Sequence, residues 1–233
     1  MSKPVCVIVG VGPGNGTALA RKFAAEGYAV ALLARHEGYI KTLEEQLENA
    51  RACRCDATDE INVKEVFDQI RKEFGAIEVL VYNAGSGHFN NVEETTPAMF
   101  ESDWRTNALG CLLTTQRVIP DMRKRGQGTI VVIGATASWT GNAGFAPFAA
   151  AKSAQRSLVQ SMARHLGPAG IHVAYVIIDG VIDLPRTRQL MADKPDNFFI
   201  NPDHIADSVF FLTVQKPSAW TFELDLRPFG EKW

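Results

Sequence analysis

Cysteine is scarce in this chain, with four among 233 residues, and neither sign of charge is in clear excess. So few cysteines argue against a fold held together by disulfides. The 24 Lys and Arg residues nearly balance the 26 Asp and Glu residues, which argues against a nucleic-acid partner and against binding to an anionic membrane surface. Hydrophobic residues make up 46% of the chain, so we expect a globular protein.

The chain also lacks any charged residue from 126 to 151, its longest uncharged stretch. Glycines, Asn142 and Pro147 interrupt the apolar residues there, whereas a membrane span needs about 20 mostly apolar residues. The apolar run at 5–9 stops at a glycine-rich turn and is too short for the core of a secretory signal. We therefore predict a cytoplasmic protein with no membrane partner.

Short β-branched apolar runs alternate with segments of helical periodicity along the chain. The predicted strands lie at 5–9, 28–33, 51–55, 77–82, 129–133, 171–178 and 220–226. The predicted helices lie at 17–26, 36–50, 60–74, 97–122, within 145–166, and at 203–212. This alternation indicates an α/β fold: a Rossmann-type, doubly wound parallel sheet of about seven strands in a three-layer αβα arrangement. We predict a single domain over 1–233, with a substrate loop at 184–200.

A glycine-rich turn lies between the first predicted strand and the first predicted helix. Gly10, Gly14 and Gly16 would let a pyrophosphate approach the backbone and the N-terminus of the helix. Glycines also form plain turns, but here the strand, turn and helix that the motif requires are all present. We therefore predict a dinucleotide-binding domain in which these glycines and Asn15 contact the cofactor.

The second predicted strand is followed by Ala34 and Arg35. A carboxylate at this place would bind both hydroxyls of an adenosine ribose, which Ala34 cannot do. Arg35 can instead pair with a 2′-phosphate through charge-assisted hydrogen bonds. We therefore predict that NADP(H) is preferred over NAD(H); the alternative interpretation is that Arg35 is a solvated residue at the start of the next helix.

These features resemble the short-chain dehydrogenase/reductase family over essentially the whole chain. The glycines match its GxxxGxG motif, and residues 83–85 match its NAG motif. The resemblance implies a nicotinamide cofactor, hydride transfer to or from a small-molecule substrate, and a homodimer or homotetramer. It adds these residues to the predicted cofactor contacts: Asp56, Ala57, Asn83, Ala84, Gly85, Lys152, Gly180 and Ile182.

The resemblance also identifies catalytic positions, and two of them are altered. Lys152 matches the lysine of the family's YxxxK motif, and Asn107 matches its catalytic asparagine, either as a remnant of a water relay or as a hydrogen-bonding residue at a helix kink. The tyrosine position is Phe148 and the serine position is Ala135, and none of the four tyrosines is followed by lysine four residues later. Loss of a general acid lowers the rate about 10²–10⁴-fold. We therefore expect the family's usual mechanism, with tyrosine as the acid, to be strongly impaired.

Few residues could replace the missing hydroxyls. Asp179, after the sixth predicted strand, could donate a proton or stabilise a cationic substrate, or could be a solvated turn residue. His88 could act as an acid or base near neutral pH, although a lone loop histidine is often incidental. Thr136 or Ser138 could supply a hydroxyl in place of the missing serine.

The expected substrate site has an apolar and aromatic wall. We predict that Ala135, Ser138, Trp139, Phe145 and Phe148 form it, and that it suits an apolar or flat substrate. Aromatic residues also serve as ordinary core. The spacing of the cysteines indicates no metal site.

Three functions follow from these observations. The first is an NADP(H)-dependent oxidoreductase with a non-standard active site, which reduces a carbonyl, an imine or iminium, or an activated double bond of a small apolar substrate. The second is a non-catalytic or regulatory protein that binds NADP(H). The third is a non-redox isomerase or lyase in which His88 and Asp179 act as an acid and base pair.

Overall fold

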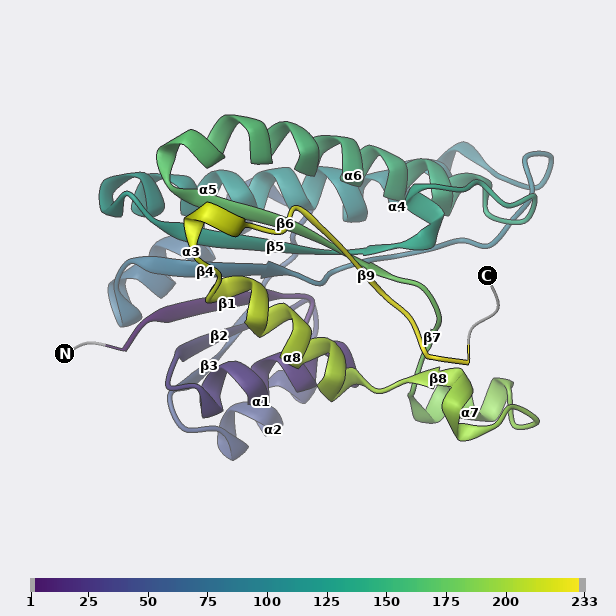
Figure 1. The fold of residues 1–233 in the computed structure, drawn as a ribbon, viewed down its shortest axis with the longest axis horizontal. Coiled ribbons are helices and arrows are strands. Elements are labelled where there is room, and N and C mark those ends of the chain that lie inside the picture. Colours follow the sequence, from purple (N-terminus) through teal and green to yellow (C-terminus); the bar gives the residue numbers. More distant parts are fainter. Residues whose placement is uncertain (1–2, 231–233) are drawn as a thin grey trace.

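A parallel seven-stranded sheet lies at the centre of the computed structural model, which describes residues 3–230 (Figure 1). The strand order is β3-β2-β1-β4-β5-β6-β9. The strands are β1 (Val5–Val9), β2 (Ala29–Ala34), β3 (Ala50–Arg54), β4 (Ile77–Tyr82), β5 (Gly128–Ala135), β6 (Ile171–Ile178) and β9 (Glu223–Leu226). This arrangement confirms the predicted Rossmann-type fold. The order reverses between β1 and β4, and ligands of such sheets bind at that point, beyond the carboxyl ends of the strands.

Helices cover both faces of the sheet and form two separate cores (Figure 1). One face is covered by α3 (Glu60–Phe74), α4 (Pro97–Trp104), α5 (Gly110–Arg125) and α6 (Ala146–Leu166). The other face is covered by α1 (Asn15–Ala25), α2 (Glu37–Gln46) and α8 (Pro202–Thr213). Strands β1 and β6 are buried along their whole length because helices lie on both sides of them.

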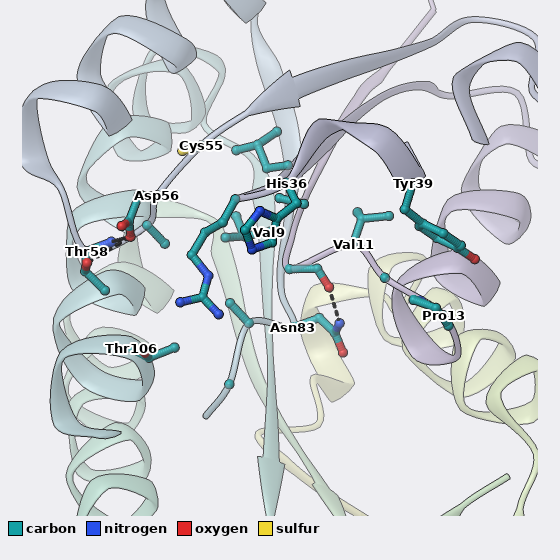
Figure 2. A pocket seen from close by; sticks show the side chains of 18 residues that line it. Val9, Val11, Pro13, His36, Tyr39, Cys55, Asp56, Thr58, Asn83 and Thr106 are labelled. Carbon is teal, nitrogen blue, oxygen red and sulfur yellow. Dashed lines mark hydrogen bonds between the residues drawn. The ribbon is translucent and has the colours of Figure 1, made fainter. Parts of the chain in front are cut away.

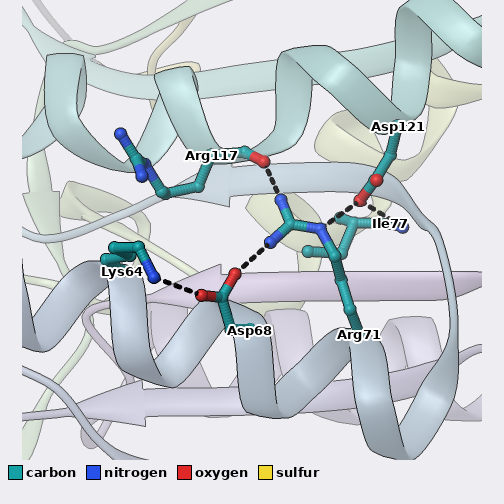
Figure 3. A network of polar contacts seen from close by, with 6 residues as sticks. All are labelled: Lys64, Asp68, Arg71, Ile77, Arg117 and Asp121. Carbon is teal, nitrogen blue, oxygen red and sulfur yellow. Dashed lines mark hydrogen bonds and ion pairs between the residues drawn. The ribbon is translucent and has the colours of Figure 1, made fainter.

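A polar network joins α3 to α5 at the amino end of β4 (Figure 3). The Nε atom of Arg71 donates to Asp121 Oδ2 at 2.9 Å, and another guanidinium nitrogen donates to the main-chain oxygen of Arg117. The same Asp121 oxygen accepts a hydrogen bond from the main-chain nitrogen of Ile77 at 3.2 Å. This network lies at the sheet edge opposite to the ligand-binding edge, so we assign it to stability.

Two regions differ from the predicted elements. The helix predicted at 97–122 is divided by a π-helical turn, Arg105–Leu109, between α4 and α5. The segment at 184–200, predicted as a loop, contains the short helix α7 (Pro185–Leu190) and also β8 (Phe199–Ile200), which pairs with β7 (Val181–Ile182). Strands of two residues are too short to give a periodic signal in the sequence. Within residues 3–230, no helix combines the length and hydropathy needed to cross a membrane.

Candidate active site

A cleft of about 380 Å³ crosses the carboxyl ends of β1, β2, β3 and β4 (Figure 2). It includes the glycine-rich turn and the NAG segment, residues 83–85, which lie far apart in the sequence. The structure brings to this cleft the following predicted cofactor-binding residues: Gly10, Arg35, Asp56, Ala57, Asn83, Ala84 and Gly85.

The glycine-rich turn is fixed against the NAG segment. Asn83 Nδ2 donates to the main-chain oxygen of Gly10 at 2.7 Å (Figure 2). Gly10 has φ of 90°, and a Cβ atom there would lie 2.5 Å from the backbone of Ala84. A Cβ atom on Gly12 would instead meet nothing within 4 Å, because this part of the turn faces open space. The turn is therefore tightly packed on one side and open to a ligand on the other.

Asp56 and Arg35 lie at the end of the cleft formed by β2 and β3. Asp56 Oδ1 accepts hydrogen bonds from the main-chain nitrogen and the hydroxyl of Thr58, at 2.9 and 2.8 Å (Figure 2). Burial alone would raise the pKa of Asp56, but these bonds and the charge of Arg35 outweigh it and lower that pKa. Arg35 is exposed and shares a shallow hollow with His36, Glu37 and Arg54, and Glu37 is paired with Lys41 at 2.6 Å. A bound anion would therefore meet the guanidinium groups of Arg35 and Arg54 there.

A second cavity, of about 750 Å³, continues from this cleft, since Asn83 and Gly85 line both. It opens between the ends of β5 and β6, the loop after β4, and helices α6 and α7. Most of the remaining predicted site residues line it: Asn15, Ala135, Phe145, Phe148, Lys152, Asp179, Gly180 and Ile182. Among the described residues that line it, Asp179 is the one acidic side chain, and Lys152 and Arg186 are the basic ones.

Three aromatic rings pack together on the wall of this cavity. The ring centroids of Phe89 and Phe145 are 5.1 Å apart, and those of Phe89 and Phe148 are 5.3 Å apart. A Cβ atom on Gly87 would lie 2.8 Å from Cδ2 of Phe148, so the absence of a side chain at Gly87 makes room for this ring. Phe148 thus occupies a defined position one helical turn before Lys152.

Lys152 is 6% exposed and is held by two hydrogen bonds. Its Nζ atom donates to the main-chain oxygen of Ile133 and to Gln155 Oε1, both at 3.1 Å. An ammonium group has three donors, so one N–H remains for a ligand. Burial lowers the pKa of Lys152 to about 8, because an apolar environment disfavours the charged form of an amine.

The Gln155 side chain connects Lys152 to the π-helical turn. Its Nε2 atom donates to the main-chain oxygen of Asn107 at 3.0 Å, while its Oε1 atom accepts from Lys152. Sequence reasoning missed Gln155. The available signal was a polar residue three positions after Lys152, on a helical face that the fold buries.

Asn107 makes the hydrogen bonds of a helix-kink residue. Its Nδ2 atom donates to the main-chain oxygens of Asp103, one turn earlier, and of Ser86, in the loop after β4. Its own main-chain oxygen is already bound by Gln155. Of the two roles that the sequence left open for Asn107, the structure therefore favours kink bonding over a water relay.

Asp179 does not present a free charge to the cavity. Its Oδ2 atom lies 3.1 Å from Nη1 of Arg227, and its Oδ1 atom accepts a hydrogen bond from the hydroxyl of Thr136 at 2.8 Å. The Ser138 hydroxyl donates to the main-chain oxygen of Ala135 at 2.7 Å. Of the three roles that the sequence left open for Asp179, the ion pair with Arg227 disfavours stabilisation of a cation. Both hydroxyls already donate a hydrogen bond within the protein, which disfavours them as replacements for the missing serine.

His88, Ser138 and Trp139 are not among the described residues that line the second cavity. The Nδ1 atom of His88 lies 2.9 Å from Oδ1 of Asp103, a completely buried carboxylate that also accepts a hydrogen bond from the Ser86 hydroxyl. Trp139 is 43% exposed. These three residues thus lie outside the described lining of the second cavity, and His88 holds the loop after β4 against α4 through Asp103.

The glycine-rich turn and the continuous cleft at the reversal of strand order define a dinucleotide-binding α/β protein. The sequence model of the short chain dehydrogenase family matches residues 4–195. The chain therefore belongs to this family of oxidoreductases, which use a nicotinamide cofactor.

Relatives and solved structures agree with this assignment. The chain is 32% identical to the 3-oxoacyl-(acyl-carrier-protein) reductase of Mycobacterium avium over 184 residues, 79% of this chain and 69% of the relative. A crystal structure of a short-chain dehydrogenase from Rhodopseudomonas palustris has a TM-score of 0.83 at 31% identity, with 97% of this chain and 99% of that chain covered. A metagenomic short-chain oxidoreductase solved in complex with NADP has a TM-score of 0.85 at 26% identity, with 99% of each chain covered.

Proposed function

We propose that this protein is an NADP(H)-dependent oxidoreductase with a non-standard active site, which reduces a carbonyl, an imine or iminium, or an activated double bond. The observation that carries the proposal is the position of Lys152, at the far end of a cleft that begins at Arg35. A cofactor lying along this cleft would meet basic residues at both ends and an aromatic substrate cavity beyond. The homodimer or homotetramer implied by the family resemblance remains a prediction.

The residues present fit such a cofactor. Gly12 faces open space where a pyrophosphate would approach the turn. Asn15 is only 7% exposed, and its Oδ1 atom has no hydrogen-bond partner within the described part of the chain. Buried amide oxygens are normally bonded, so a ligand donor at Asn15 would satisfy this atom. Gly10, Gly14, Gly16, Asp56, Ala57, Gly180 and Ile182 would complete the contacts that we propose.

Lys152 is the proton donor that we assign to the expected reaction centre. Bound nicotinamide would supply or accept the hydride. Lys152 lines the cavity, and its Nζ atom is fixed by Ile133 and Gln155 and keeps one N–H for a ligand. Because Phe148 carries no hydroxyl, we propose that the Lys152 ammonium provides the proton that a reduction consumes.

A substrate screen tests this function. Ketones, enones and cyclic imines are offered with NADPH, and oxidation of NADPH is followed by absorbance, with the Lys152→Ala variant as the background. We expect at least one class to be turned over above that background. If NADPH binds and every class stays at background, the oxidoreductase proposal fails.

Arg35 should decide between the two nicotinamide cofactors. We expect Arg35→Ala to weaken NADPH binding about tenfold or more, because charge-assisted hydrogen bonds contribute about 1.5–3 kcal/mol, and to leave NADH binding unchanged. Isothermal titration calorimetry measures both affinities. Arg51→Ala is the matched control, since Arg51 is exposed on β3 and pairs with Glu44, outside the cleft. An equal loss for NADH and NADPH would show that Arg35 does not recognise the 2′-phosphate.

A protein that binds NADP(H) without chemistry is the second candidate function. Phe148 and Ala135 favour it, since both family hydroxyls are missing from a cavity that is otherwise formed. In this case NADPH would raise the melting temperature by mass action, and no substrate in the screen would be turned over. A non-redox isomerase or lyase gains no support, because His88 is bound to Asp103 and Asp179 to Arg227.

A further inference from the structure

We infer that the substrate carries an anionic group, a carboxylate or phosphate, and that Arg186 binds it at the rim of the second cavity. The inference rests on the proposed function, because it describes the substrate of the same site. Arg186 lies on α7, is exposed and lines the cavity that also contains Lys152. Within residues 3–230, no acidic side chain forms an ion pair with it.

The charges around the cavity favour a negative ligand. The acidic residue of the lining, Asp179, is compensated by Arg227 at 3.1 Å. Asp183, the acidic residue nearest in sequence to α7, is bound by Arg188 at 2.7 Å. Lys152 and Arg186 therefore remain as uncompensated basic residues among the described lining. Such a cavity attracts anions and repels cations, so a cationic iminium becomes the less suitable substrate.

The shape of the lining adds a second requirement. The cluster of Phe89, Phe145 and Phe148 offers an apolar and aromatic surface next to Lys152. A ligand that satisfies both features has an aromatic or alkyl body, a reducible group that reaches Lys152, and an anionic group at Arg186. Aryl and alkyl carboxylates or phosphates with a carbonyl group form this substrate class.

Matched pairs of small ligands test the inference by binding alone. Phenylacetate and phenyl phosphate are compared with the neutral phenylacetamide, each titrated calorimetrically into the protein saturated with NADP⁺. We expect both anions to bind at least about tenfold more tightly than the amide, as a charge-assisted hydrogen bond implies. Arg186→Gln should remove this preference, whereas Arg164→Gln, an exposed arginine on α6 outside the cavity, should retain it.

The cofactor pyrophosphate is another anion that a guanidinium can bind, so the affinity for NADP⁺ is measured in the same variants. If Arg186→Gln weakens NADP⁺ binding and leaves the ligand preference intact, Arg186 serves the cofactor and the inference is wrong. Equal binding of anions and amide by the unaltered protein, or no binding of any probe, also overturns it. Failure to bind NADP⁺ at all would instead contradict the proposed function, and the anion preference is then read in the cofactor-free protein.

Discussion

The double substitution Phe148→Tyr with Ala135→Ser is expected to raise the reduction of simple ketones by NADPH about 10²–10⁴-fold, the range typical of a positioned general acid. Phe148 lies four residues before Lys152 on α6, and both line the same cavity. A hydroxyl on this ring would therefore lie on the same helical face as the ammonium group, which favours ionisation of a nearby hydroxyl.

The surroundings of both positions should accept the new hydroxyls. Phe148 is seated against Gly87, and the ring faces the cavity. Ala135 ends β5 and also lines the cavity, so a serine there would direct a small hydroxyl toward the same space. The tyrosine would then donate the proton and the serine would stabilise the developing oxyanion.

The measurement is kcat/KM for a series of ketones, with NADPH affinity as the check that the variant is folded. Phe145→Tyr with Ala135→Ser is the matched control, because Phe145 belongs to the same aromatic cluster but is not one turn from Lys152. The control should remain at the level of the unaltered protein. A double variant that binds NADPH and reduces no ketone would mean that position 148 does not face the reacting group.

The second large effect is the expected dependence of the reduction rate on pH, which we attribute to Lys152. If its ammonium is the proton donor, the rate of reduction should fall about tenfold per pH unit above the pKa of about 8. Lys152→Met should lower kcat/KM about 10²–10⁴-fold and remove this dependence. A pH profile of kcat/KM measures both, and Lys72→Met, at an exposed lysine on α3, is the control. A profile that stays flat from pH 7 to 10 in the unaltered protein would exclude Lys152 as the donor.

The free energy of unfolding should rise with pH over the range in which the rate of reduction falls. Below pH 8, Lys152 is charged in both the folded and unfolded states, and the folded state bears the cost of burying that charge. Between about pH 8 and 10.5 the unfolded chain binds more protons than the folded chain, so this group makes the free energy of unfolding rise with pH, by at most about 1.4 kcal/mol per unit. Lys152→Met should lack this rise in urea unfolding measured across the same range.

The parts of the site that depend on local sequence were predictable. The glycine-rich turn lies between a buried strand and a helix, and Lys152 lies four residues after Phe148, so their positions follow from short spacings. The sheet order then brings these segments to one edge. The altered tyrosine and serine positions were identified from the resemblance to the family, and Phe148 and Ala135 both line the cavity.

The long-range polar contacts were not predictable, because the two partners of each contact come from distant parts of the chain. Arg227 lies 48 residues after Asp179 in the sequence, and Gln155 lies 48 residues after Asn107. Only the fold brings such residues together, and these contacts decide whether a charge is available to a substrate. The pairing of Asp179 with Arg227 removes one reason to expect a cationic substrate and supports our inference of an anionic one.

The bridge formed by Gln155 limits how Lys152 regains a proton. A side-chain amide does not pass protons along as water or a hydroxyl does, and it occupies the route from Lys152 to the main-chain oxygen of Asn107. Among the described residues, the two hydrogen-bond partners of the amine, the main-chain oxygen of Ile133 and Gln155 Oε1, have no proton to give, so we expect a proton to return through the cavity. Since a bound product covers that opening, recharging of the amine would have to wait until the product leaves. Lys152 would thus donate one proton in each catalytic cycle and would be protonated again by solvent between turnovers.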